Sequence, residues 1–229
     1  FSLSIFLVSC KGSRFDLDQK SIAVVGYTID CRVISSQDWG DETLMQEKEC
    51  LITGHDMVFL KGYINDLKTD IEKAIPGTKI LLADTFKKNG VFRQLPSKVG
   101  HNLHYTLPPY KSIDIHHTTY NPFLSNALKV DALAVLHLVF IKDPVDESFV
   151  SNFTGNESRS RLGLHGDLEI VSKENQLFSE SFEVFLDDTK NVDNGTNLLQ
   201  LGDDYRDEYV RLLEKLRSEI RHAIMRLSS

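Results

Sequence analysis

ALAVLHLVFI, residues 132–141, is the stretch that decides the fold. It is a short, almost unbroken apolar run, which is typical of a strand buried on both faces of a sheet. Such a strand lies at the centre of a sheet, where other strands flank it and other elements cover it. His137 is its one polar member, and we expect it to be a hydrogen-bonded core residue.

The segments before this run predict alternating strands and helices. Residues 21–34 are β-branched and aromatic and predict a first strand. Apolar residues recur every three or four positions from 60 to 75, which predicts a helix that ends at Pro76-Gly77. Residues 78–86 predict a second buried strand, and Asn121-Pro122 predicts the cap and first residue of a short helix.

The last third of the chain predicts a hairpin and a long helix. Segments 161–172 and 176–186 alternate in polarity around a polar turn, which indicates antiparallel strands. Apolar residues at helical spacing from 205 to 227 predict the strongest helix, with Asp203 as its cap and a solvated charged face that includes Arg217. The resulting order favours an α/β fold, a mixed β-sheet packed with helices in a two-layer or three-layer sandwich.

Composition bounds the class of protein. The 229 residues suit one domain, and 26 Lys+Arg against 33 Asp+Glu give a net charge of -7. An acidic chain lacks the basic face that nucleic acid requires, so we expect no nucleic-acid partner. Three cysteines are too few for a scaffold built from disulfides. The glycine and serine motifs of nucleotide-binding proteins and serine hydrolases are missing from the sequence.

The first ten residues, FSLSIFLVSC, are apolar and uncharged and end abruptly at Cys10. The run is too short to span a bilayer, which needs about 20 residues. It fits the apolar region of a signal peptide. The alternative is a buried first strand in which Cys10 is a small hydrophobic residue.

Leu7-Val8-Ser9-Cys10 resembles the bacterial lipobox. The resemblance implies that Cys10 receives a diacylglyceryl group, that the chain is cut before it, and that the new amine is acylated with a fatty acid such as palmitate. Two or more acyl chains anchor a protein stably to a membrane. By the sorting rule of enteric lipoproteins, Lys11 after the cysteine favours the outer membrane over the inner membrane.

This interpretation divides the chain into three parts. Residues 1–9 are the remnant of a signal peptide, and residues 10–20 are the lipidated cysteine and a polar tether. Residues 21–229 form a single α/β domain with an irregular insertion at 87–121. We therefore expect a location in the bacterial envelope.

The domain also resembles a family of envelope lipoproteins. IAVVGY at 22–27 loosely matches the opening strand of that family, and ALKVDALAV at 127–135 partly matches its Ala-Asp strand. A hairpin and a terminal helix follow, as in the family that contains the curli-secretion-channel lipoprotein and the lipoprotein activator of penicillin-binding proteins. The resemblance implies a fold similar to the amino-terminal domain of TolB. The family's usual Gly between Ala and Asp is absent, and the insertion at 87–121 is longer. The composition resembles that of spirochaetal proteins.

Cys31 and Cys50 lie in apolar surroundings and leave two alternatives open. A disulfide between them would close a loop of about 20 residues and contribute about 3 kcal/mol in the chain-entropy model. Otherwise they are two unconnected buried thiols.

Insertion 87–121 holds the candidate partner-binding residues. Cations next to flat aromatic rings suit recognition of a protein or a glycan, because rings cover area at low entropic cost. The alternative is that the rings pin the loop to the core. The candidates are Arg93, Tyr105, Tyr110, Lys111 and Tyr120.

The same insertion is rich in histidine. His101, His104, His116 and His117 could bind zinc or copper, and they are the basis of a second hypothesis, an envelope metal-binding protein or enzyme. The alternative is four surface histidines. The first hypothesis is a lipid-anchored protein with no catalytic activity and no cofactor, whose domain binds another envelope component as an adaptor or scaffold.

Overall fold

The computed structural model describes residues 17, 20, 21–35, 52, 54–97, 105–113, 115, 120–144, 160–173, 176–190 and 205–227. For eight of these residues, 31, 32, 35, 55, 120, 144, 176 and 227, only the backbone is described.

The described strands form one mixed sheet in the order β2-β1-β4-β5-β6, with β3 paired to β1. Its first half is parallel, because β1 runs alongside both β2 and β4. Its second half is an antiparallel meander of β4, β5 and β6. The strands are β1 (Ser21–Ser35), β2 (Lys79–Leu82), β3 (Tyr105–Thr106), β4 (Ala132–Pro144), β5 (Ser160–Ser172) and β6 (Gln176–Lys190).

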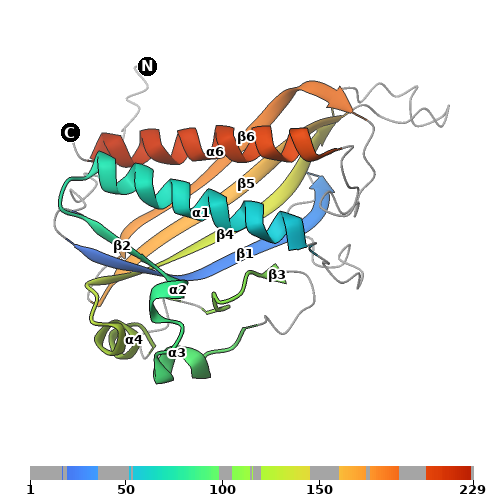
Figure 1. The fold of residues 1–229 in the computed structure, drawn as a ribbon. Helices are drawn as coiled ribbons and strands as arrows, with labels where there is room; N and C mark the ends of the chain where they lie inside the picture. The colour runs from blue at the N-terminus through green and yellow to red at the C-terminus, as the bar shows by residue number, and fades with distance from the viewer. Residues whose placement is uncertain are drawn as a thin grey trace, which may run out of the picture.

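Two long helices form a layer on one face of this sheet. Figure 1 shows α1 and α6 lying side by side across the strands, while α2, α3, α4 and β3 gather away from that layer. α2 and β3 contact β1, and α4 contacts β4 and β5. The predicted mixed α/β fold is confirmed, with one main helical layer. The helices are α1 (Gly54–Ala74), α2 (Ala83–Phe86), α3 (Gly90–Gln94), α4 (Tyr120–Leu128) and α6 (Arg206–Leu227). Among the described residues, no helix is long and apolar enough to cross a membrane.

Three local expectations need correction. The strand predicted at 78–86 ends at Leu82, and residues 83–86 turn into α2. Asn121 lies inside α4 rather than capping it: its side chain donates to the Ser172 carbonyl and accepts from the Ser125 hydroxyl. Arg217 is not simply solvated, because its guanidinium joins α6 to Asp66 and Asp70 of α1. The cap predicted at Asp203 lies outside the described residues.

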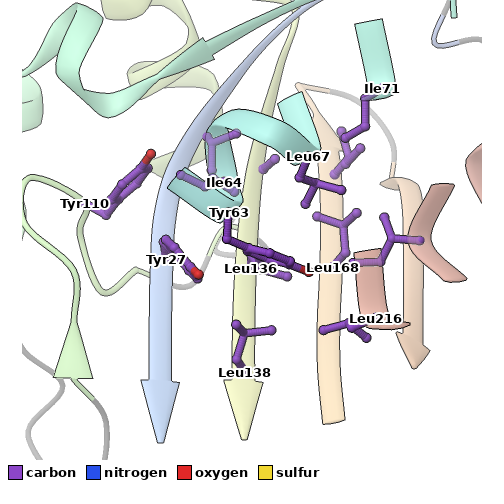
Figure 2. Close-up of a cluster of buried hydrophobic side chains, with 14 of the residues drawn as sticks. Tyr27, Tyr63, Ile64, Leu67, Ile71, Tyr110, Leu136, Leu138, Leu168 and Leu216 are labelled. Carbon is purple, nitrogen blue, oxygen red and sulfur yellow. The ribbon is translucent and has the colours of Figure 1, made fainter. Parts of the chain in front are cut away.

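The core lies between the sheet and the two long helices (Figure 2). Gly166 of β5 lets α6 come close: a Cβ there would lie 2.8 Å from the Cδ2 atom of Leu216. Tyr27 and Tyr63 are also buried here, and their hydroxyls have no hydrogen-bond partner within the described part of the chain. Burial raises the pKa of both phenols. This face of the sheet is therefore stabilised mainly by apolar contact.

Candidate functional site

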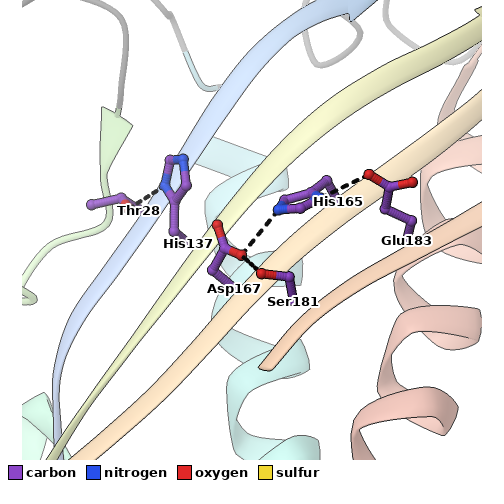
Figure 3. Close-up of polar contacts among 6 residues, drawn as sticks. All are labelled: Thr28, His137, His165, Asp167, Ser181 and Glu183. Atoms are coloured by element: carbon purple, nitrogen blue, oxygen red, sulfur yellow. Dashed lines mark hydrogen bonds and ion pairs between the residues drawn. The ribbon is translucent and has the colours of Figure 1, made fainter. Parts of the chain in front are cut away.

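The face of the sheet opposite α1 and α6 carries a group of polar side chains, here called the second-face cluster. Strand register builds it: Thr28 of β1 pairs with His137 of β4, His137 with Asp167 of β5, and Asp167 with Ser181 of β6. Because paired residues of neighbouring strands point to the same side, these side chains form one row across the sheet. His165 and Glu183 form a second pair two residues along, and Figure 3 shows all six together.

His165 is the centre of the cluster. Its Nε2 atom lies 3.0 Å from Asp167 Oδ1 and its Nδ1 atom 3.3 Å from Glu183 Oε1, so both ring nitrogens face carboxylates. Burial alone would lower the pKa of His165, but the hydrogen bonds and negative charges of Asp167 and Glu183 outweigh burial and raise it. The cluster therefore favours an imidazolium held between two carboxylates.

The same geometry decides what chemistry Ser181 and Asp167 can perform. Burial would raise the pKa of Asp167, yet the hydrogen bonds from His165 and Ser181 lower it, so the carboxylate is a weak base. The Ser181 hydroxyl donates to Asp167 Oδ1 at 2.5 Å, and that oxygen also faces His165. An activated serine needs its proton directed at a free base. The arrangement is an ionic lock between strands rather than a nucleophile with its base.

The cluster was not predicted from the sequence, although the spacing of its residues indicates it. His165 and Asp167 are two apart on one predicted strand, and Ser181 and Glu183 are two apart on the next. In a hairpin that turns at residue 174, residues 167 and 181 lie opposite each other, as do 165 and 183. Register counted outward from the turn would have placed the four side chains together.

Part of insertion 87–121 is attached along the free edge of β1 beyond β2. β3 pairs antiparallel with β1 at Thr28 and Ile29. The Leu107 amide then donates to the Tyr27 carbonyl at 3.0 Å, and the Lys111 amide to the Val25 carbonyl at 2.8 Å. The described part of the insertion therefore completes the sheet edge that the short β2 leaves unpaired.

The five candidate partner-binding residues take different places. Tyr110 is buried with its ring edge-on to Tyr27. It belongs to the core, so the prediction that it lies on a partner-binding surface is wrong. Tyr105 and Lys111 are half-buried, and the Lys111 ammonium lies 5.7 Å from the centre of the Phe92 ring. Arg93 is exposed on α3. The backbone of Tyr120 begins α4, but its side chain is outside the description.

The remaining predicted sites mostly lie outside the described residues. These are Cys10, Cys50, His101, His104, His116 and His117. Cys31 has only its backbone described, within β1, so the two alternatives for the cysteines stay open. Within the described ranges, no group of three or more His, Cys, Asp or Glu side chains has an arrangement that could hold a metal ion.

The chain enters the domain earlier than residue 21. Leu17, expected in the tether, is 2% exposed and packs in the core. Its carbonyl accepts a hydrogen bond from the Thr78 hydroxyl at 2.6 Å, and the Lys20 carbonyl accepts one from the Lys79 amide. Six residues, 11–16, lie between Cys10 and Leu17, the first residue that the structure describes.

Comparison with known proteins gives limited similarity. No protein-family model matches the chain, and no curated protein matches its sequence. Among solved structures, the lipoprotein GNA1162 from Neisseria meningitidis has 14% identity and a TM-score of 0.33, covering 84% of this chain and 98% of its own. CT253 from Chlamydia trachomatis has 9% identity and a TM-score of 0.33, with 90% and 97% covered. A neuraminyllactose-binding hemagglutinin homolog from Helicobacter pylori has 10% identity and a TM-score of 0.26, with 96% and 94% covered. At TM-scores this low, neither the fold nor the function of these proteins can be assigned to this chain.

Proposed function

We propose that this chain is a bacterial envelope lipoprotein, anchored through acyl chains on Cys10, whose α/β domain binds another envelope component as an adaptor or scaffold. The proposal assigns it no catalytic reaction. It also places the anchor in the outer membrane, on the basis of Lys11 after the cysteine.

The observation that carries the anchoring proposal is the position of Leu17. Its side chain is in the core and its carbonyl accepts a hydrogen bond from Thr78, so the chain already belongs to the folded domain at residue 17, seven positions after the lipobox cysteine. Cys10 therefore precedes the described domain by a short polar stretch, KGSRFD. A lipid-modified cysteine needs this arrangement, because the enzymes that modify it must reach it at the membrane.

Two observations support a binding role. The second-face cluster directs the Ser181 proton to a carboxylate of low pKa, which argues against a hydrolytic nucleophile there. The described segment 105–111 of the insertion is held to β1 by backbone hydrogen bonds, while Arg93 on α3 is exposed. An edge that is hydrogen-bonded to the sheet and carries an exposed arginine suits contact with a protein partner.

Metabolic labelling with palmitate in bacteria that express the full chain tests the anchor. We expect the wild-type chain to incorporate label and Cys10→Ala to incorporate none. Cys31→Ala is the matched control, because it also removes one thiol, and it should keep the label. Equal labelling of wild type and Cys10→Ala would refute the anchoring proposal.

Site-specific crosslinking in intact cells tests the binding role. A photoreactive residue at Arg93 should give a discrete crosslinked product with one envelope protein. The control position is Glu214, which is exposed on α6 in the layer of the two long helices and should give no such product. Absence of a product at Arg93, or identical products at both positions, would count against this surface.

A further inference from the structure

One end of the domain gathers exposed cations from five different elements. The end is defined by the entry of the chain: Lys20 lies beside Lys79, and Asp131 is bonded to Ser21. α1 and α6 end there, and so does β5 (Figure 1). We call it the anchor end, and its exposed cations are Lys73 at the end of α1, Lys79 on β2, Lys129 after α4, Lys173 after β5 and Arg221 on α6.

These cations differ from those at the opposite end of the sheet. At the opposite end Arg161 pairs with Asp143, Arg211 with Asp188 and Lys215 with Asp187. Among the described residues, none of the five anchor-end cations lies within ion-pair distance of a carboxylate.

The carboxylates at the anchor end offset part of this positive charge, and Asp70 and Glu72 are already paired with Arg217 and Lys68. Glu72 accepts hydrogen bonds from Lys68 and the Ile80 amide, and Asp131 accepts two from Ser21. Glu219 on α6 is exposed and offsets one positive charge. Among the described residues, the five exposed cations therefore outnumber the two carboxylates of this end that have no lysine or arginine partner, Asp131 and Glu219, on a chain whose net charge is -7.

Lys129 adds a second, independent observation. It follows the last residue of α4 in a left-handed conformation, with φ of 57°. The Val130 amide donates to the Ser125 carbonyl and the Lys129 amide to the Asn126 carbonyl, the pairing of a helix end that favours glycine at position 129. A lysine there is exposed, and its left-handed backbone costs local stability that glycine would not.

We infer that the anchor end is a docking surface for the phosphates of anionic lipid headgroups. The inference rests on the proposed function, because Cys10 then fixes this end near a bilayer. The seven residue steps from Cys10 to Leu17 span at most roughly 25 Å, so the membrane lies close to the end where Leu17 enters the core. Charge attraction acts within about 8 Å of a surface at physiological salt, and a tether this short keeps these cations near enough to reach that range.

Vesicle co-sedimentation of the full chain with Cys10→Ser tests the surface without the lipid anchor. We expect binding to phosphatidylcholine vesicles that contain about a third phosphatidylglycerol, weaker binding to pure phosphatidylcholine, and loss of the difference at high salt. Replacing Lys73, Lys79, Lys129 and Lys173 with Gln should lower the partition coefficient by roughly fivefold for each lysine at low salt.

The matched control replaces four cations away from this end, Lys61, Arg161, Arg211 and Lys215, with Gln. It changes the net charge equally and should keep the binding. Equal loss in both variants, or no preference for anionic vesicles, would overturn the inference. Palmitate labelling of wild-type protein is independent of this result, so failure of the docking surface and failure of the anchor are distinguishable.

Lys129→Gly separates the charge from the fold. Glycine relieves the left-handed strain, so we expect this variant to unfold at a higher temperature than wild type and yet to bind anionic vesicles several-fold more weakly. Unchanged binding by a stabilised Lys129→Gly would remove Lys129 from the proposed surface.

Discussion

The two faces of the sheet are stabilised by different means. The face beneath α1 and α6 is apolar, and the buried hydroxyls of Tyr27 and Tyr63 have no partner within the described chain. On the second face, each polar side chain of the cluster has a partner. Thr28 bonds to His137 and Ser181 to Asp167 on neighbouring strands, and His165 bonds to Asp167 on its own strand. The helical face gains free energy from area removed from water. The second-face cluster gains it from paired polar groups whose charges depend on pH.

The comparison shows that apolar packing and the second-face cluster of one sheet should depend differently on pH. Packing on the helical face does not depend on proton concentration, whereas the state of His165 does. Substitutions that act on one face only are therefore the way to test the distinction.

Leu216→Ala should have the largest effect. Leu216 is fully buried on α6 above Gly166, so its truncation leaves a cavity between helix and sheet. We expect the free energy of unfolding to fall by about 2–5 kcal/mol in urea titrations. Leu177→Ala, at a half-buried leucine of β6, is the control and should cost less than half as much. Equal costs would mean that Leu216 on the helical face is no better packed than Leu177 near the start of β6.

Tyrosine hydroxyls give the next largest contrast. Tyr209 of α6 donates to Asp56 at the start of α1 across 2.8 Å in a buried position. Tyr209→Phe should therefore lower the free energy of unfolding by about 1–3 kcal/mol. Tyr63→Phe removes an unpaired hydroxyl and should leave stability unchanged or raise it by about 1 kcal/mol. Thermal unfolding of both variants measures the difference, and a destabilised Tyr63→Phe would show that this hydroxyl has a partner.

The second-face cluster should show a smaller, pH-dependent effect. The pKa of His165 is raised in the folded state, so its contribution is full below about pH 6.5 and is lost as pH rises through the folded pKa. The pKa of Asp167 is lowered, so its contribution is full above about pH 4 and is lost as pH falls through the folded pKa.

The two signs together predict that the cluster contributes most between about pH 4 and pH 6.5. His165→Gln should therefore cost more stability at pH 5.5, on the order of 1 kcal/mol, than at pH 8.5. Urea titrations at both pH values measure this. A cost that is independent of pH would show that His165 contributes by packing alone.

The long strands and helices were predicted from the sequence because each has a strong local signal, whereas the short α2, α3 and β3 were not predicted. The apolar run at 132–141 became the central strand β4, and the hairpin around 173–175 formed as predicted. The strand at 78–86 was predicted too long, because apolar residues occur in the first turn of α2 as well as in β2. Short apolar runs carry no period that separates the two.

The candidate functional residues were predicted less well from the sequence, because a site depends on tertiary contacts. Tyr110 and Arg93 both belong to one irregular insertion, and only the fold shows that the tyrosine is buried and the arginine exposed. The anchor end was equally hidden. Its lysines come from segments as far apart as Lys73 and Lys173, and only the topology brings them to one end.

The intact mass of the protein purified from native membranes tests the central claim most directly. The account predicts a mature chain that begins at Cys10 and carries the added mass of a diacylglyceryl group and an acylated amine, while Cys10→Ala keeps residues 1–9. A mass that includes residues 1–9 on an unmodified Cys10 in the wild-type protein would contradict it.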